Sequence, residues 1–258
     1  MDQLILAATS CDTVNEVVCA PADPVEFFEF ARTPILMGLA GLIVVVSLVV
    51  AFARPKVVPG RFQMIMESLV DIPRNLGKDV IGHGAEKFYP LLVSLFLFIL
   101  VGNAFEVTPF INFPITSRMA VSGSLALLVW FVFVVTGVAK QGVGYFGHLL
   151  WPPGIPVAIK PVVGIIEFVS VLIIRPFSLA VRLFANLVAG HTMLSLLLGS
   201  AVWFLIAGQG VGGRLIGLAW GTFGIAIYVF EILVAFLQAY VFTLLTSVYI
   251  GSSLHPEH

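Results

Sequence analysis

The stretch LIGLAWGTFGIAIYVFEILVAFLQAYVFTLLTSVYI, at residues 215–250, does most to decide the fold. Its only charged side chain is that of Glu231. A helix needs about 20 consecutive apolar residues to cross the hydrocarbon core of a bilayer. The stretch exceeds that length, and a helix of this size fits into a membrane by tilting. We therefore expect a long, tilted membrane-spanning helix here.

Four further apolar stretches precede it, and together the five predict an all-α integral membrane protein. The earlier spans are predicted at residues 34–53, 89–110, 120–139 and 157–207. The chain of 258 residues is 59% hydrophobic and 10% charged, whereas soluble domains carry about 25% charged residues. The stretch 157–207 must tilt strongly, kink or run along the membrane interface, and Pro176 is placed to kink it. A glycine-rich turn at 208–213 joins it to the last span, which predicts an antiparallel hairpin of two long helices.

Between the first two spans, residues 54–88 contain six lysines and arginines, with apolar side chains at helical spacing. This pattern is typical of an amphipathic helix that lies on the membrane surface, and we expect one at about residues 60–82. Clustered prolines predict a loop over residues 140–156. Basic loops stay in the cytoplasm, so the N-terminus is expected outside and the C-terminus inside.

Residues 1–33 are predicted to form an external segment, and residues 34–258 a single transmembrane domain. Cys11 and Cys19 in the external segment could form a disulfide or remain two thiols, and the sequence leaves both open. No metal-binding or hydrolase motif occurs, so we expect neither a metal nor a cofactor. Basic runs that would bind nucleic acid are also missing from the sequence.

Ionisable side chains inside the predicted spans are few, and each costs about 2.5–3.5 kcal/mol on insertion, which makes them functional candidates. They are Glu106, Glu167, Arg175, Arg182, His191 and Glu231. Three of them also have simpler interpretations. Arg175 could be a structural cation near the kink, His191 a hydrogen-bonded packing residue, and Glu106 a group that merely touches outside water.

Arg182 is the central candidate because no acid within two turns of its own helix could neutralise it. Ser178, Arg182 and Asn186 share one helical face. Glu167 lies 15 residues earlier, within about 60° of that face on α-helical spacing. On the last helix, Glu231 and Gln238 are seven residues apart and also share a face.

An antiparallel arrangement of the two helices would bring Arg182 and Gln238 near the membrane midplane. His191 and Glu231 would then lie about 10–14 Å toward the outside, and Glu167 toward the inside. Carboxyl and imidazole groups exchange protons, whereas an arginine stays charged. A permanent cation between two polar tracks stops protons from leaking straight through, so the pattern predicts proton conduction.

Three motifs resemble subunit a of F-type ATP synthases. The first is RPFSLAVRLFANLVAGH at residues 175–191, around the essential arginine of that family. The second is EILVAFLQAYVFTLLTSVY at residues 231–249, and a weaker third is NAFEVTP at residues 103–109. The resemblance covers most of the chain from about residue 35, and the cysteine-containing segment lies outside it.

The resemblance implies a role for each matching residue. Arg182 would face a ring of c subunits and pair with each ring carboxylate as it passes. An outer half-channel would be lined by Asn103, Glu106, Asn186, His191, Glu231 and Gln238. An inner half-channel would be lined by Glu167, together with Ser170.

The resemblance also implies where the protein works and with what. It would be a stator subunit in the bacterial plasma membrane, with the mitochondrial inner membrane as the alternative. Its partners would be the c ring, b-type peripheral stalk subunits and the remaining ATP synthase subunits, and it would not be an enzyme by itself. Whether the ion is H⁺ or Na⁺ stays open.

Two other classes of protein compete with this interpretation. A secondary transporter could use a buried arginine to bind an anionic substrate, but no inverted repeat relates the two halves of the chain. A structural membrane anchor would give no reason to keep costly polar groups on facing helices.

Overall fold

The structure is a computed structural model that describes residues 24–53, 59–108, 119–142, 144–150, 159–207 and 210–254. All regular secondary structure within these ranges is helical. Five of these helical stretches are long and apolar enough to cross a membrane: Thr33–Phe52, Ala85–Phe105, Met119–Gln141, Lys160–Ile206 and Val211–Leu254. The prediction of an all-α integral membrane protein is confirmed.

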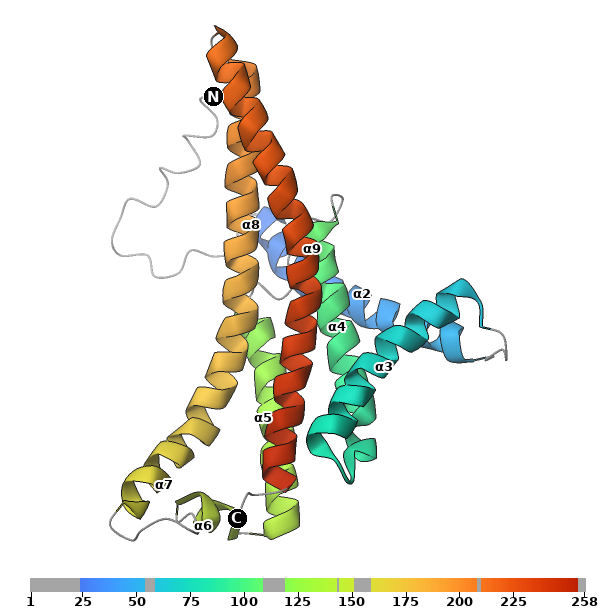
Figure 1. Cartoon of the computed structure of the whole chain (residues 1–258), viewed down its shortest axis with the longest axis vertical. Helices are drawn as coiled ribbons and strands as arrows, with labels where there is room; N and C mark the ends of the chain where they lie inside the picture. The colour runs from blue at the N-terminus through green and yellow to red at the C-terminus, as the bar shows by residue number, and fades with distance from the viewer. Residues whose placement is uncertain are drawn as a thin grey trace. The chain divides into compact units, whose positions relative to one another are not determined.

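The chain divides into two compact units, residues 1–38 and 39–258, and the arrangement described below is that of the second. The helices in chain order are α2 (Pro24–Phe52), α3 (Arg61–Ile81), the 3₁₀ helix η1 (Ala85–Phe88), α4 (Tyr89–Val107), α5 (Met119–Gln141), α6 (Gly144–Leu150), α7 (Lys160–Val169), the π-helical turn η3 (Ser170–Ile174), α8 (Arg175–Ala207) and α9 (Gly210–Leu254) (Figure 1).

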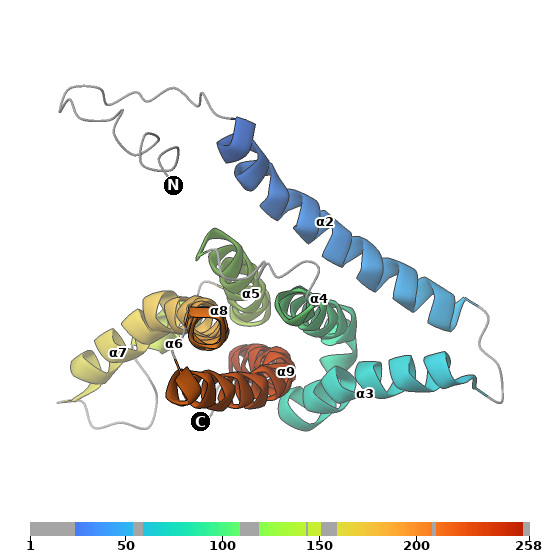
Figure 2. The same ribbon diagram turned by 90° about the horizontal axis from the view of Figure 1, so that it is seen from above.

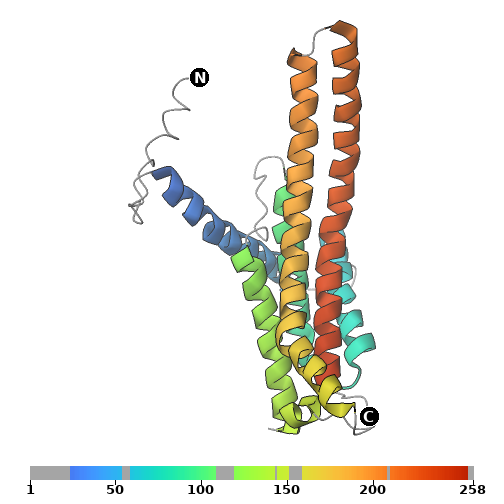
Figure 3. The ribbon, with the colours of Figure 1, turned by 90° about the vertical axis from the view of Figure 1, so that its left-hand side faces the viewer.

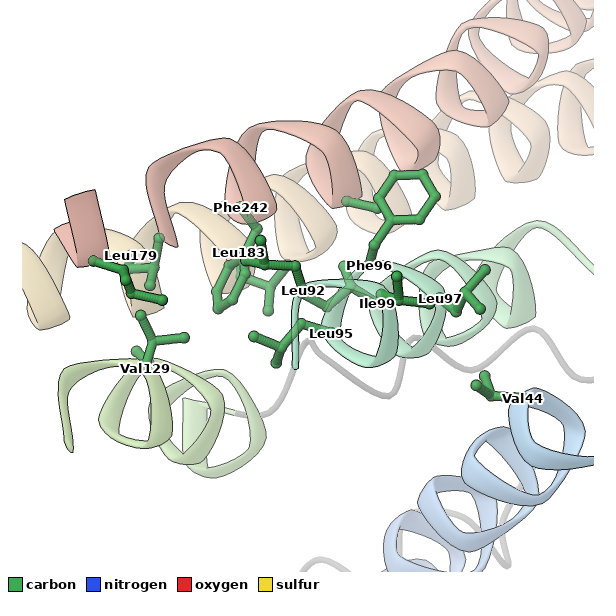
Figure 4. Packing of buried hydrophobic residues seen from close by; sticks show 14 of the residues in the cluster. Val44, Leu92, Leu95, Phe96, Leu97, Ile99, Val129, Leu179, Leu183 and Phe242 are labelled. Carbon is green, nitrogen blue, oxygen red and sulfur yellow. The ribbon is translucent and has the colours of Figure 1, made fainter. Parts of the chain in front are cut away.

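Helix α9 is the centre of the second unit. It packs against α3, α4, α5 and α8, and the view along the bundle shows α4, α5 and α8 grouped around it (Figure 2). The core between these helices contains large apolar side chains that are almost fully buried. Leu92 and Phe96 of α4 meet Leu183 of α8 and Phe242 of α9 there (Figure 4).

The last two long helices run side by side as an antiparallel hairpin and extend beyond the ends of α4 and α5 (Figure 3). The 45 residues of α9 correspond to about 67 Å of helix, at about 1.5 Å per residue. A hydrocarbon core is about 30 Å thick. A helix of this length must therefore lie strongly tilted if it stays within the bilayer.

The glycine-rich connection between α8 and α9 differs from the prediction. Residues 208–213 were expected to form a turn, but α9 already begins at Gly210. Each glycine lowers helix propensity by about 1 kcal/mol, which favours a turn in isolation. These residues form the first turn of a helix that packs closely on α8 further along, at Gly217. A Cβ atom at Gly217 would lie 3.0 Å from the backbone nitrogen of Leu205.

The segment 140–156 is also more structured than predicted, since α6 occupies Gly144–Leu150 within it. The clustered prolines predicted a loop here, so the sequence pattern gave no indication of this short helix. Tertiary packing explains it: Tyr145 is buried, and its ring lies over Gly137 of α5. A Cβ atom at Gly137 would come within 2.6 Å of that ring.

The long stretch before the hairpin bends at η3 and Pro176. The backbone N–H of Arg175 donates to the carbonyl oxygen of Ser170, five residues earlier, instead of four. Pro176 has no N–H, and its ring crowds the carbonyl four residues before it. One π-helical turn accommodates that crowding, and such turns are a known cause of helix bends.

Helix α3 has the amphipathic character that the sequence predicted. Its buried face includes Met66, Val70 and Ile81, and it packs against α4 and α9. Phe62 and Ile65 on another face are exposed. The position of this helix on the membrane surface remains a prediction.

Candidate functional site

Arg182 lies in the first half of α8 with its side chain exposed. Leu179 and Leu183, which flank it, are buried in the core, so Arg182 lies at an exposed edge of the face by which α8 packs against the bundle. Among the residues that the structure describes, Arg182 has no hydrogen bond or ion pair. A cation in an apolar helix needs a counter-charge, and the described part of this chain does not supply it.

The surface beside Arg182 carries small side chains. Ala185 and Ala189 are exposed and lie within about 60° of Arg182 around the helix. Ser178, one turn before Arg182, is half-buried. Small residues let another helix approach closely, so a partner helix would have access to the guanidinium.

Glu231 of α9 lies directly against the backbone of α8 at Gly190. A Cβ atom at Gly190 would lie 2.2 Å from Oε1 and 2.7 Å from Oε2 of Glu231. The carboxyl group therefore occupies the space that any other residue at 190 would fill. The sequence predicts Glu231 at the level of His191, which directly follows Gly190.

Asn103 of α4 lies against α9 and is 1% exposed. Its Nδ2 donates a hydrogen bond of 3.3 Å to the carbonyl oxygen of Ala235. Gln238, one turn further along α9, is 7% exposed, and its buried Nε2 has no hydrogen-bond partner in the described part of the chain. An unsatisfied buried amide of this kind marks a place where water can bind.

Asn186 is half-buried on α8, one turn beyond Arg182. The predicted roles of Glu106 and His191 concern side chains that lie outside the described part of the structure, although both residues belong to helices. Cys11 and Cys19 also lie outside the described residues, so their pairing remains open.

Glu167 and Ser170 lie on the far side of the bend from Arg182. Glu167 is half-buried near the end of α7, and Ser170 begins η3. The predicted angle of about 60° between Glu167 and Arg182 assumed continuous α-helix. The π turn between the two residues breaks that regular spacing, so the angle stays a prediction.

Gly190 is the site residue that the sequence analysis missed. An isolated glycine inside a helix costs about 1 kcal/mol relative to alanine and usually has a packing or functional reason. Its position in the quoted motif, directly before His191, was the available indication.

The fold and the site define a multi-pass membrane protein whose polar residues gather on two long, adjacent helices and on the helix packed against them. A family model described as ATP synthase A chain matches residues 34–251. The chain belongs to this family, which confirms the resemblance found in the sequence.

Similar proteins support the assignment, and each is called ATP synthase subunit a. The one from Gluconobacter oxydans is 39% identical over 229 residues, which cover 89% of this chain and 90% of the relative. The one from a Nocardioides species is 41% identical over 85% of this chain and 80% of the relative. The one from Mesorhizobium japonicum is 35% identical over 98% of this chain and 100% of the relative.

Membership of this family has direct consequences. The protein is a multi-pass component of a bacterial membrane and belongs to the membrane sector of an ATP synthase. It is part of a proton-translocating complex and is not catalytic by itself.

Proposed function

We propose that this subunit is the stator element that provides two offset proton half-channels to a rotating c ring. Arg182 faces the ring and pairs with each ring carboxylate after that carboxylate has lost its proton. The observation that carries the proposal is the exposed guanidinium of Arg182, which has no partner among the described residues.

The outer half-channel follows the α4–α8–α9 side of the hairpin in this proposal. Protons enter past Glu106 and His191 and reach the carboxyl group of Glu231, which lies against Gly190. Asn103 and the unsatisfied amide of Gln238 hold water between the helices, and Asn186 extends this path toward Arg182. The ring carboxylate takes up the proton there and enters the lipid in its neutral form, because a charged one would be costly in hydrocarbon.

The inner half-channel begins where the ring returns to the subunit. The carboxyl group releases its proton toward Glu167 and Ser170 and becomes an anion. Arg182 attracts that anion, and its fixed charge repels any proton that would pass directly from one half-channel to the other. Net proton flow therefore requires the ring to turn, which couples translocation to rotation.

The partners that this mechanism needs are the c ring and the b-type stalk subunits, which prevent the stator from turning with the ring. The proposed topology has the N-terminus outside and the C-terminus in the cytoplasm, because basic residues concentrate in segments 54–88 and 140–160. The surface position of α3 belongs to the same topology.

The test is ATP-driven proton pumping in inverted membrane vesicles that carry Arg182→Ala. Pumping should fall by about tenfold or more, as when a single electrostatic group is removed from a site that depends on it. Passive leak through the membrane sector should rise. The matched control is Arg214→Ala, which removes an exposed arginine from the start of α9 and should leave pumping unchanged.

Both variants must assemble, and their soluble ATPase activity must match the parent. Undiminished pumping in an assembled Arg182→Ala complex would remove Arg182 from the ion path. The transporter interpretation would then take its place, and purification of the protein without a ring of small subunits would support it.

A further inference from the structure

Arg175, the first residue of α8, contacts the last turns of α9. Its Nη1 donates a hydrogen bond of 3.2 Å to Oγ of Ser252. Its Cζ lies 5.2 Å from the centre of the Tyr249 ring, within the range of a cation–π interaction. The Ser252 hydroxyl in turn donates to the carbonyl oxygen of Tyr249. One side chain of α8 thus contacts two groups on a single turn of α9.

The end of α9 that Arg175 contacts is itself fixed by α5. Lys140 Nζ donates to the carbonyl oxygen of Leu254 at 2.5 Å, and Gln141 Nε2 donates to that of Ser253 at 3.2 Å. Carbonyl groups in the last turn of a helix lack intrahelical partners, and cations there are favourable. The last turn of α9 is therefore a stable point of attachment for α8.

Helix α8 needs such an attachment because of the bend that precedes it. The π turn η3 lies directly before Arg175, and Pro176 directly after it cannot donate a backbone hydrogen bond. A shift between π-helical and α-helical bonding at this point would rotate all of α8 by about 100°. That rotation would turn Arg182 away from the surface it now faces.

Arg175 is well placed to prevent this rotation. It lies seven residues before Arg182, so the two side chains point within about 20° of each other around the helix. Fixing the direction of Arg175 consequently fixes the direction of Arg182.

We propose that Arg175 is a positioning residue for Arg182. Its contacts with Tyr249 and Ser252 hold the rotation of α8 immediately after the π turn. This inference rests on the proposed function of Arg182 and adds a requirement to it. Arg182, which faces the ring, must be held in its orientation by Arg175, which lies outside the proton path.

The experiment measures ATP-driven pumping and passive proton leak in vesicles, each per assembled complex. Arg175→Ala and Tyr249→Leu remove the contact, whereas Arg175→Lys and Tyr249→Phe keep a cation and a ring. The first two should pump about fivefold less and leak more, and the conservative pair should recover most of the pumping. The double variant Arg175→Ala/Tyr249→Leu should be no worse than either single one, because both remove the same contact.

Arg214→Ala is the matched control, because it removes an exposed cation from the opposite end of α9. It should leave the ratio of pumping to leak unchanged. An equal defect in this control would overturn the positioning role, since the loss of any cation from the two long helices would then have the same effect.

The remaining outcomes are also decisive. Less complex in the membrane with normal pumping per complex would make Arg175 a purely structural residue and overturn the inference. Normal pumping by Arg175→Ala beside failed pumping by Arg182→Ala would refute only the positioning role. Normal pumping by Arg182→Ala would refute the proposed function instead.

Discussion

Substitution of Gly190 by alanine tests the contact between α8 and Glu231 most directly. The new Cβ atom would lie 2.2 Å from Oε1, about 1.2 Å short of the 3.4 Å at which ordinary van der Waals contact begins. Because the carboxyl group is the end of a flexible side chain, it would move aside and the fold would survive. Alanine also favours the helix by about 1 kcal/mol, so weaker helix formation could not explain a loss of function.

The displaced carboxyl group would leave the path between Asn103 and Arg182. A displacement of about 1 Å at a functional site can cost up to about 100-fold in rate, and we expect ATP-driven pumping to fall by about tenfold. Glu231→Asp shortens the side chain by one methylene, about 1.5 Å. The double variant Gly190→Ala/Glu231→Asp should therefore pump better than Gly190→Ala alone.

Gly221→Ala is the matched control in the same hairpin. Its Cβ atom would lie 3.8 Å from that of Ala201, an ordinary contact, so pumping should stay at the parental level. Normal pumping by Gly190→Ala would show that the position of the Glu231 carboxyl group is unimportant, and the geometric argument would be refuted.

Two further variants separate stability from proton conduction. Asn103→Leu removes the hydrogen bond to Ala235 and should destabilise the packing of α4 on α9 by about 0.6 kcal/mol. The measurement is the melting temperature of the purified complex, which should fall. An unchanged melting temperature would contradict this prediction. Gln238→Leu removes an amide nitrogen with no partner among the described residues, so the melting temperature should stay equal or rise while pumping falls. A marked drop in melting temperature would show that the amide nitrogen does make a stabilising hydrogen bond.

The long apolar helices could be predicted from the sequence because a span in lipid must consist of consecutive apolar residues. The same simple rule failed where tertiary contacts decide local structure. Glycines at the start of α9 belong to a long helix that packs on α8 at Gly217, and α6 forms because the ring of Tyr145 packs over Gly137. Neither contact can be seen in a periodic pattern of hydrophobicity.

Part of the site could also be predicted from the rule that helices in lipid are apolar. Arg182, Asn103 and Gln238 stand out because polar groups are rare in these helices. Gly190 matters through the space it leaves, which only the packed helices reveal. The direction of Glu167 relative to Arg182 stays a prediction, because the π turn breaks the regular spacing on which it depends.

The central place of α9 has a consequence for biosynthesis. Helices α3, α4, α5 and α8 all precede α9 in the chain, and all four pack against it. The ribosome therefore releases four helices before their common neighbour exists. The packing of these helices around α9 must follow their synthesis as a separate stage.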